Sequence, residues 1–202
     1  MVISERGECM ETTLNQARLI LASASPRRRA LMAYFGVPFA VIPSSVEEIA
    51  QGTGLDQVQA LALQKGAEIF GRYPGYPVLS ADTLVCLDNA VLGKPETHEQ
   101  AERMLSALSG HTHQVVTGVC LFLPDGSILK RTATTDVLFR SIGKTELARY
   151  AASEEPMDKA GAYAMQGTGS MFIDRIVGSP SNVIGLPLCE VKELLEDAGL
   201  YP

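Results

Sequence analysis

A run of three arginines directly follows a helix-start signal near residue 25. Ser25 is a favoured N-cap residue and Pro26 a favoured first helical residue. Arg27, Arg28 and Arg29 come next, where the partial positive charge of a helix end makes each arginine unfavourable by roughly 0.3 kcal/mol. This pattern favours a bound anion, namely a phosphate chain held by guanidinium groups and backbone N–H groups. Arginines that turn into solvent or pair with carboxylates remain the alternative.

A single carboxylate stands inside a strand-like run. Asp82 lies within residues 78–87, which are otherwise apolar or small except for Ser80 and Thr83. A carboxylate in such a strand is costly unless a cation or a hydrogen-bonding task accounts for it. Asp82 is therefore predicted to hold a divalent metal or to activate a water molecule. The alternative is a carboxylate satisfied by backbone N–H groups at a bend.

Other charged residues are weaker candidates for a functional site. Glu47 and Glu48 are adjacent loop acids, and one of them becomes a metal ligand only if it faces Asp82. Lys94 lies in a rigid Gly-Lys-Pro connection, which suits a fixed charge beside a phosphate. Lys65 is a second candidate for a charge beside a phosphate. The alternative for both lysines is an ordinary position on the protein surface.

The elements that position these residues follow from hydrophobic periodicity and turn signals. Strands are expected over residues 18–23, 39–42, 78–87 with a break near residue 82, 115–123, 128–139 and 171–177. Helices are expected over residues 26–35, 55–71, 97–108 and 145–152, and from residue 187 onwards. Helices that alternate with strands and hairpins predict an α/β protein with a mixed, partly antiparallel sheet.

Several local details are predicted with these elements. The helix over 55–71 should bury Leu55 with other apolar residues, and Thr97 should form a capping box with Gln100. Residues 88–89 should form a hairpin turn that leads back to residues 91–92. His111 and His113 have no cysteine or acid nearby at metal-ligand spacing, and a hydrogen bond that anchors the loop before the strand at Val115 is expected instead.

Length and composition narrow the class of protein. The chain has 202 residues, of which 46% are hydrophobic, so it can bury a sizeable core. Its 17 basic and 23 acidic residues give a net charge of −6, which argues against a nucleic-acid partner. No apolar run approaches the roughly 20 residues of a membrane helix. The four cysteines show no paired spacing, and this favours reduced thiols and a cytoplasmic location.

Seven ordered motifs together resemble the Maf family of nucleoside triphosphate pyrophosphatases. They cover about residues 18 to 198, and the extension before Arg18 is the one unmatched part. The segments that carry the resemblance are residues 21–29, 47–48 with Lys65, 80–83, 93–95, 109–115, 158–167 and 183–187. We therefore expect residues 1–17 to be a poorly ordered extension and residues 18–202 to be a single Maf-like domain.

The resemblance implies an elongated α/β fold with two lobes and a nucleotide cleft between them. It implies hydrolysis of a nucleoside triphosphate to the monophosphate and pyrophosphate with Mg²⁺ or Mn²⁺. Asp82 matches the proton acceptor of the family, while Arg27, Thr83 and Gln166 match the positions that set base preference. The methylated-guanosine branch has tryptophan, glutamine and glutamate at these three positions. This chain therefore resembles the dTTP/UTP branch.

Each expected site residue has a role in this interpretation. The substrate would be bound by basic side chains that contact the phosphates, namely Arg27, Arg28, Lys65 and Lys94, and by Ser23. Glu48 and Asp82 would hold the metal, and activated water would attack the α-phosphorus. Gln166 and Thr83 would hydrogen-bond a pyrimidine.

Two other functions remain open. One is a pyrophosphatase for a modified or purine nucleotide, and the other is a nucleotide-binding regulator of septum formation with little turnover. Family members are linked to cell-division arrest, and a homodimer is a reasonable expectation for a small enzyme.

Overall fold

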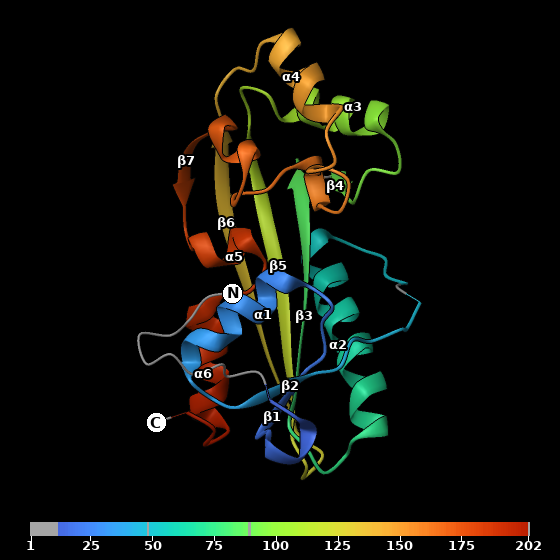
Figure 1. Ribbon diagram of the computed structural model, residues 1–202, viewed down its shortest axis with the longest axis vertical. Helices are drawn as coiled ribbons and strands as arrows, with labels where there is room; N and C mark the ends of the chain where they lie inside the picture. Colours follow the sequence, from blue (N-terminus) through green and yellow to red (C-terminus); the bar gives the residue numbers. More distant parts are fainter. Residues whose placement is uncertain (1–11, 48, 89, 202) are drawn as a thin grey trace. The chain divides into compact units, whose positions relative to one another are not determined.

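The computed structural model describes residues 12–47, 49–88 and 90–201 (Figure 1). The chain forms two compact units. Unit 1 comprises the described residues up to Asp82, together with Thr117–Ala133 and the residues from Gly185 onwards. Unit 2 comprises Thr83–Val116 and Thr134–Ile184. The prediction of one domain over residues 18–202 stays a prediction.

The described residues form seven strands of one mixed sheet. Their order is β2-β1-β3-β5-β6-β7, with β4 paired to β3. The strands are β1 Leu19–Leu21, β2 Phe39–Val41, β3 Val78–Leu87, β4 Ala90–Leu92, β5 Thr112–Phe122, β6 Ile128–Phe139 and β7 Ile173–Val177. β1 pairs in parallel with both β2 and β3, whereas β4 and β7 pair antiparallel. The predicted α/β class with a mixed, partly antiparallel sheet is confirmed.

In the described parts of the chain, the sheet is accompanied by six α-helices and by short 3-10 turns. The helices are α1 Pro26–Met32, α2 Gly54–Arg72, α3 His98–Leu108, α4 Lys144–Ala151, α5 Pro180–Ile184 and α6 Leu188–Asp197. The 3-10 turns are η1 Leu14–Gln16, η2 Ala33–Phe35, η3 Ala160–Ala162 and η4 Thr168–Phe172. None of the helices that the structure describes is both long and apolar enough to cross a membrane.

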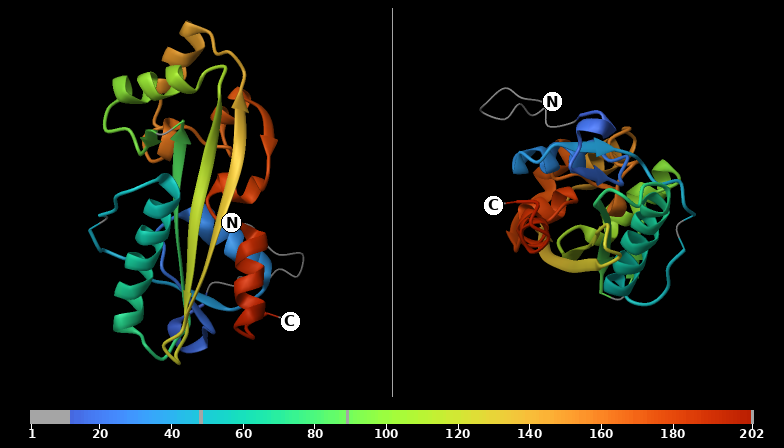
Figure 2. Two further views of the ribbon diagram at one scale, coloured as in Figure 1. Left: turned by 180° about the vertical axis from the view of Figure 1, so that it is seen from behind. Right: turned by 90° about the horizontal axis from the view of Figure 1, so that it is seen from below.

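Unit 1 packs its helices against the amino-terminal half of β3 and the hairpin end of β5 and β6. Figure 2 shows α2 and α6 on opposite sides of these strands. Its core includes Ile20, Ala62, Ile69 and Phe122, which come from β1, α2 and β5. Small residues at this contact let α2 approach the sheet closely. A Cβ atom on Gly66 would lie only 2.2 Å from the Phe122 ring.

Unit 2 has an aromatic core of its own. Phe139 packs edge-on against Tyr163 at 4.7 Å between ring centroids and against Phe172 at 6.0 Å. The apolar faces of α3 and α4 contribute Leu105, Leu108, Leu147 and Tyr150 to the same core, as their periodicity predicts. These contacts fix the segment between α4 and β7, which carries Gln166.

Three local predictions are wrong. β3 runs without interruption from Val78 to Leu87, because the Asp82 carboxylate is paired across to α2 and needs no bend. Leu55 is 45% exposed, since it lies in the first turn of α2 before the helix reaches the core. Gln100 does not complete the capping box on Thr97, because its side chain accepts from the N–H of Glu96 instead.

The remaining differences concern the ends of the chain and its irregular segments. β7 begins at Ile173 rather than at the predicted residue 171, because Met171 and Phe172 belong to η4. The short helix α5 was not predicted. Residues 1–11 of the predicted extension lie outside the described residues, whereas the Thr12 N–H donates to the Phe39 carbonyl of β2. The predicted hairpin at residue 88 is confirmed by the antiparallel pairing of β3 with β4.

Candidate active site

Lys65 of α2 and Asp82 of β3 form an ion pair in unit 1. The Lys65 Nζ donates to the Asp82 Oδ1 at 2.5 Å. The side chains are only 15% and 9% exposed, so salt screens the pair weakly. Two sequence candidates 17 residues apart therefore meet, and the bend alternative for Asp82 is excluded. The ion pair thus places a carboxylate at Asp82, which is the last residue of β3 that belongs to unit 1.

Arg28 lies against the same strand from α1. Its Nε donates to the Gly185 carbonyl at 2.7 Å, and its Nη1 donates to the Ala81 carbonyl at 2.7 Å. Ala81 immediately precedes Asp82, so these bonds hold the guanidinium charge next to the carboxylate-bearing residue. Figures 1 and 2 show α1 and α2 on either side of β3. Two cations from two helices thus reach neighbouring residues in the middle of β3, as a binding site for a polyanion requires.

The start of α1 differs from the predicted backbone cradle. Pro26 has no N–H, the Arg28 N–H donates to the Ser25 hydroxyl at 3.4 Å, and the Arg29 N–H donates to the Ser25 carbonyl. Ser25 therefore caps the helix internally, which is the physical reason that these N–H groups are not held for a ligand. The charges of the arginine side chains, rather than the helix end, carry the anion prediction.

Ser23 and Arg27 complete the predicted group in unit 1. Ser23 is 6% exposed, and its hydroxyl oxygen accepts from the Ser25 N–H at 3.2 Å, which fixes the turn between β1 and α1. Arg27 is half-buried in the first turn of α1. Their roles in substrate binding stay predictions.

Three other predicted residues belong to unit 2. Thr83 is half-buried on β3, and Lys94 is exposed after β4. The Gly161 N–H donates to the Gly93 carbonyl at 3.0 Å and fixes the connection that carries Lys94. Gln166 is exposed in the segment before η4.

Glu155 is a residue that the sequence analysis missed. Its carboxylate accepts from the backbone N–H groups of Thr168 and Gly169 at 3.0 and 2.9 Å and from the Tyr150 hydroxyl at 3.1 Å. Burial raises the pKa of Glu155, but these hydrogen bonds outweigh it and lower the pKa overall. One feature of the sequence could have pointed to Glu155. Gly167 precedes a helical turn but has no side chain to cap the following N–H groups, so a cap from elsewhere in the chain is needed.

The predicted metal site is only partly within the described residues. Glu48 lies outside them, and the adjacent Glu47 is exposed. Among described residues, no group of three His, Cys, Asp or Glu side chains could hold a metal ion. The single carboxylate of Asp82 nevertheless fits Mg²⁺, which commonly takes one or two carboxylates and completes its shell with water and phosphate oxygens.

His113 forms a hydrogen bond in unit 2 as predicted, but it lies within β5 rather than in a loop before that strand. Its Nε2 lies 2.8 Å from the Tyr163 hydroxyl, and the side chain is 1% exposed. Burial lowers the pKa of His113 to about 4, so the imidazole is neutral at physiological pH. The ring is part of the aromatic core and lies 4.8 Å from Phe139.

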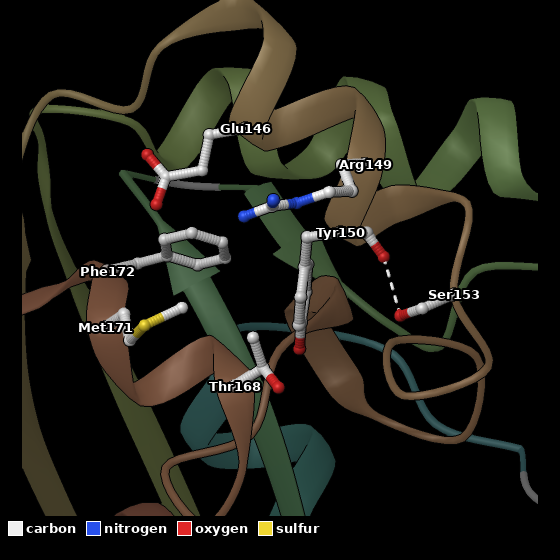
Figure 3. Close-up of a pocket in the computed structure, with 7 residues that line it drawn as sticks. All are labelled: Glu146, Arg149, Tyr150, Ser153, Thr168, Met171 and Phe172. Atoms are coloured by element: carbon white, nitrogen blue, oxygen red, sulfur yellow. Dashed lines mark hydrogen bonds between the residues drawn. The ribbon is translucent and has the colours of Figure 1, made fainter.

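A pocket of about 190 Å³ lies between α4 and η4 in unit 2 (Figure 3). It is lined by Glu146, Arg149, Tyr150, Ser153, Thr168, Met171 and Phe172. Figure 3 shows the hydroxyl end of Tyr150 directed toward Thr168. The lining includes none of the predicted site residues, so this pocket is separate from the Lys65–Asp82 pair.

Comparisons with known proteins agree on one family. The model of the family described as Maf-like protein matches residues 18–198. The dTTP/UTP pyrophosphatase of Myxococcus xanthus is 45% identical and aligns over 92% of this chain and 95% of its own length. The enzymes of the same name from Desulfotalea psychrophila and Bacillus thuringiensis are 42% and 43% identical, each over 88% of this chain and over 92% and 94% of their own lengths.

Solved structures show a more distant likeness. The nucleoside-triphosphatase, or dITP/XTP pyrophosphatase, of Mycobacterium abscessus has a TM-score of 0.46 and 14% identity over 90% of this chain and 92% of that chain. The family match, by contrast, spans residues 18–198, a range that includes all the motifs noted in the sequence. The predicted resemblance is therefore confirmed: this protein belongs to the Maf family.

Proposed function

We propose that this chain hydrolyses dTTP and UTP to the nucleoside monophosphate and pyrophosphate. The observation that carries the proposal is the shielded Lys65–Asp82 pair with Arg28 bonded to the preceding residue. A structural ion pair would not need a second cation bonded to the neighbouring residue of the same strand. The names of the relatives support a nucleoside triphosphate pyrophosphatase with pyrimidine substrates.

The residues of unit 1 act on the triphosphate. Arg28 and Lys65 bring two positive charges to Ala81 and Asp82 of β3, and Arg27 adds a third from the turn of α1 that carries Arg28. These groups neutralise the charge that the phosphate oxygens carry and that grows on the leaving pyrophosphate. Lys94 of unit 2 supplies a further fixed charge, and Ser23 shapes the turn from which α1 starts.

The reaction is a displacement at the α-phosphorus. A water oxygen forms a bond to this phosphorus, and the bond from the phosphorus to the bridging oxygen of the β-phosphate breaks. Asp82 accepts the proton of the attacking water, and pyrophosphate leaves with the electron pair of the broken bond. Lys65 holds the Asp82 carboxylate by its 2.5 Å hydrogen bond and so orients the base.

A divalent cation, Mg²⁺ or Mn²⁺, fits the oxygen donors that Asp82 offers. Asp82, together with Glu48, would hold it. When bound it would supply a positive charge that polarises the phosphoryl oxygens and the attacking water. Arg28 and Lys65 are also positively charged, so they neutralise the triphosphate together with the cation.

Base recognition is assigned to Gln166 and Thr83. The Gln166 side chain offers an amide donor and a carbonyl acceptor, which suit the N–H and C=O edge of uracil and thymine. Thr83 adds a hydroxyl on β3. Gln166 is exposed and comes from a fixed segment, so its amide is available to a ligand.

The deciding experiment uses a panel of nucleoside triphosphates in ¹⁸O-water with Mg²⁺ or Mn²⁺. Attack at the α-phosphorus places the label in the monophosphate and leaves the pyrophosphate unlabelled. Release of labelled monophosphate from dTTP and UTP supports the proposal. Diphosphate and phosphate as products would show attack at the γ-phosphorus. Turnover of purine or modified nucleotides alone, or binding without turnover, would support the alternative functions.

Three coarser expectations complete the proposal. Residues 18–202 act as a single catalytic domain, the protein works in the cytoplasm where nucleoside triphosphates are made and used, and two copies form a homodimer. Light scattering of the purified protein at micromolar concentration tests the last of these. The link to cell-division arrest stays a prediction from the family resemblance.

A further inference from the structure

The segment that carries Gln166 is fixed on both sides of this residue. Before it, Tyr163 is 5% exposed and its hydroxyl is hydrogen-bonded to His113. After it, the N–H groups of Thr168 and Gly169 are bound by Glu155. Gln166 itself points out of this frame as an exposed side chain. The tip of the segment is therefore held by two anchors that belong to different elements of unit 2.

Glu155 replaces a cap that the local sequence does not provide. η4 begins after Gly167, which has no side chain, whereas a Ser, Thr or Asp there would cap the following N–H groups locally. The Glu155 carboxylate reaches the same two N–H groups from a segment more than ten residues earlier in the chain. A remote cap of this kind ties the loop to the end of α4, which a local cap would not do.

The glycine and the carboxylate fit one another. A Cβ atom on Gly167 would lie 2.5 Å from the Glu155 Oε1, so only glycine leaves room for the carboxylate. The φ of Gly167 is +148°, a value that side-chain-bearing residues rarely adopt.

The rest of the carboxylate's surroundings fix it in turn. The Tyr150 hydroxyl donates to Glu155 Oε1 at 3.1 Å, and the Tyr150 ring packs edge-on against Phe172 at 4.9 Å. The Lys159 Nζ donates to the Glu155 backbone carbonyl at 2.6 Å. Glu155 is thus held from its main chain and its side chain at once.

We propose that Glu155 is a positioning residue for base selection, which fixes the loop so that Gln166 presents its amide to the pyrimidine. The inference rests on the proposed function, in which Gln166 contacts the base. A polar group that must discriminate between bases has to be held rigidly, because a mobile amide adapts to either edge. Glu155 does not touch the substrate and acts through Gln166.

The test compares Glu155→Gln with Glu154→Gln in the full-length protein. Both substitutions remove one negative charge. Glu154 is exposed, whereas the Glu155 carboxylate accepts hydrogen bonds from the loop. The readout is the ratio of kcat/KM for UTP to kcat/KM for CTP. Glutamine has one acceptor oxygen where glutamate has two, so we expect Glu155→Gln to lower this ratio about tenfold. Glu154→Gln should leave it within about twofold of the wild type.

A second comparison places both changes in one protein. Gln166→Ala should lower the UTP to CTP ratio by itself, and adding Glu155→Gln to it should lower the ratio no further. A merely structural role for Glu155 would reduce turnover of UTP and CTP equally and leave the ratio unchanged, which overturns the proposal. An additional fall of the ratio in the double variant also overturns it, since Glu155 would then act without Gln166.

Two further measurements keep the proposal testable if Glu155→Gln folds poorly. Tyr150→Phe removes only the hydroxyl that donates to Glu155 and keeps the ring against Phe172, and we expect it to lower the ratio about threefold. Hydrogen exchange of the Thr168 and Gly169 amides should become about tenfold faster in Tyr150→Phe or Glu155→Gln than in Glu154→Gln. Unchanged exchange and an unchanged ratio would overturn the proposal.

The two proposals fail in different ways. If wild-type protein releases no monophosphate from UTP or dTTP, the proposed function fails and base selection has no meaning. If wild-type turnover is as proposed and Gln166→Ala lowers the UTP to CTP ratio but Glu155→Gln leaves it unchanged, only the positioning role fails. If Gln166→Ala leaves the ratio unchanged, the role of Gln166 in base recognition fails together with the positioning role, while the hydrolysis itself stands.

Discussion

The chemistry assigned to this protein depends most on one carboxylate and the two cations around it. Asp82 is held by Lys65, and Arg28 is bonded to the carbonyl of the residue before it. If Asp82 only stabilised the fold, its neutral isostere would cost stability, because Lys65 would lose its partner, but the folded variant would keep its rate. A carboxylate that accepts a proton or holds a cation could not be replaced without loss of the reaction.

The first prediction concerns Asp82→Asn. We expect kcat for dTTP to fall about 100-fold or more, because the neutral amide of asparagine does not accept the proton of water and binds a divalent cation more weakly than a carboxylate. Steady-state release of pyrophosphate measures the effect, and circular dichroism checks that the variant is folded. Asp174→Asn, at an exposed position of β7, is the matched control and should retain wild-type kcat. A folded Asp82→Asn enzyme with kcat near wild type would remove Asp82 from the mechanism.

The second prediction concerns Gln166→Glu. The change removes the amide donor and adds a negative charge at the same length, so turnover of dTTP and UTP should weaken by about tenfold or more in kcat/KM. Initial rates over a range of each nucleotide give the constant. Glu154→Gln serves as a folded control with an altered charge nearby in sequence. Equal dTTP turnover by the Gln166→Glu variant and the wild type would show that the assigned role is wrong.

At the scale of the elements, the closeness of α2 to the sheet places Lys65 within reach of Asp82. The contact depends on Gly66, which follows Lys65 and lies against Phe122 and the Ser80 hydroxyl. The Ser80 hydroxyl also donates to the Ala62 carbonyl of α2 at 2.7 Å. Beside Lys65, helix and strand therefore approach through small residues and a buried hydrogen bond.

The third prediction uses two glycines of the same helix. Gly66→Ala should destabilise the protein by about 1–3 kcal/mol, because its Cβ would lie 2.2 Å from the Phe122 ring and must displace it. Gly71→Ala meets nothing within 4 Å and should be neutral or stabilising by up to about 1 kcal/mol, since alanine favours a helix. Urea unfolding measures both.

Activity adds a second readout to this pair. Gly66→Ala should also reduce kcat, since α2 moves together with Lys65, whereas Gly71→Ala should not. If the two alanine variants were equally stable, the close approach of α2 to β5 would not be the contact that sets the position of Lys65.

At the scale of the whole molecule, stability should depend on pH through a buried histidine. Burial lowers the pKa of His113 to about 4, compared with an ordinary value of 6.5 in the unfolded chain. Between these pH values the unfolded chain binds a proton that the folded protein does not. The free energy of unfolding should therefore fall as the pH decreases from about 6.5 to about 4, by up to roughly 3 kcal/mol.

This fourth prediction is checked by urea unfolding at a series of pH values from 7.5 to 4.5. His113→Gln keeps a polar partner for Tyr163 but does not titrate, so its stability should change less over this range than that of the wild type. His111→Gln, at an exposed position two residues earlier, should retain the wild-type dependence. The same slope in the His113→Gln variant would assign the effect to other groups.

Sequence reasoning predicted most elements because they depend on local signals. Ser25 and Pro26 form a local helix-start signal, and α1 begins at Pro26 with Ser25 as its N-cap. The errors lie where tertiary contacts override such signals. The charge of Asp82 suggested a break in β3, but a lysine on another element satisfies it within the strand. Gln100 reached a neighbouring N–H group that its spacing did not specify.

The amino-acid sequence by itself determined the α/β class, the residues able to do phosphate chemistry and, through its ordered motifs, the family. Only the tertiary structure decided that Lys65 meets Asp82, that Arg28 is held on the strand beside it, and that Glu155 holds the loop of Gln166. The reason is physical. Propensities, caps and turns act between residues a few positions apart, whereas an ion pair or a remote cap depends on how closely packed elements approach, and this is set by the core as a whole.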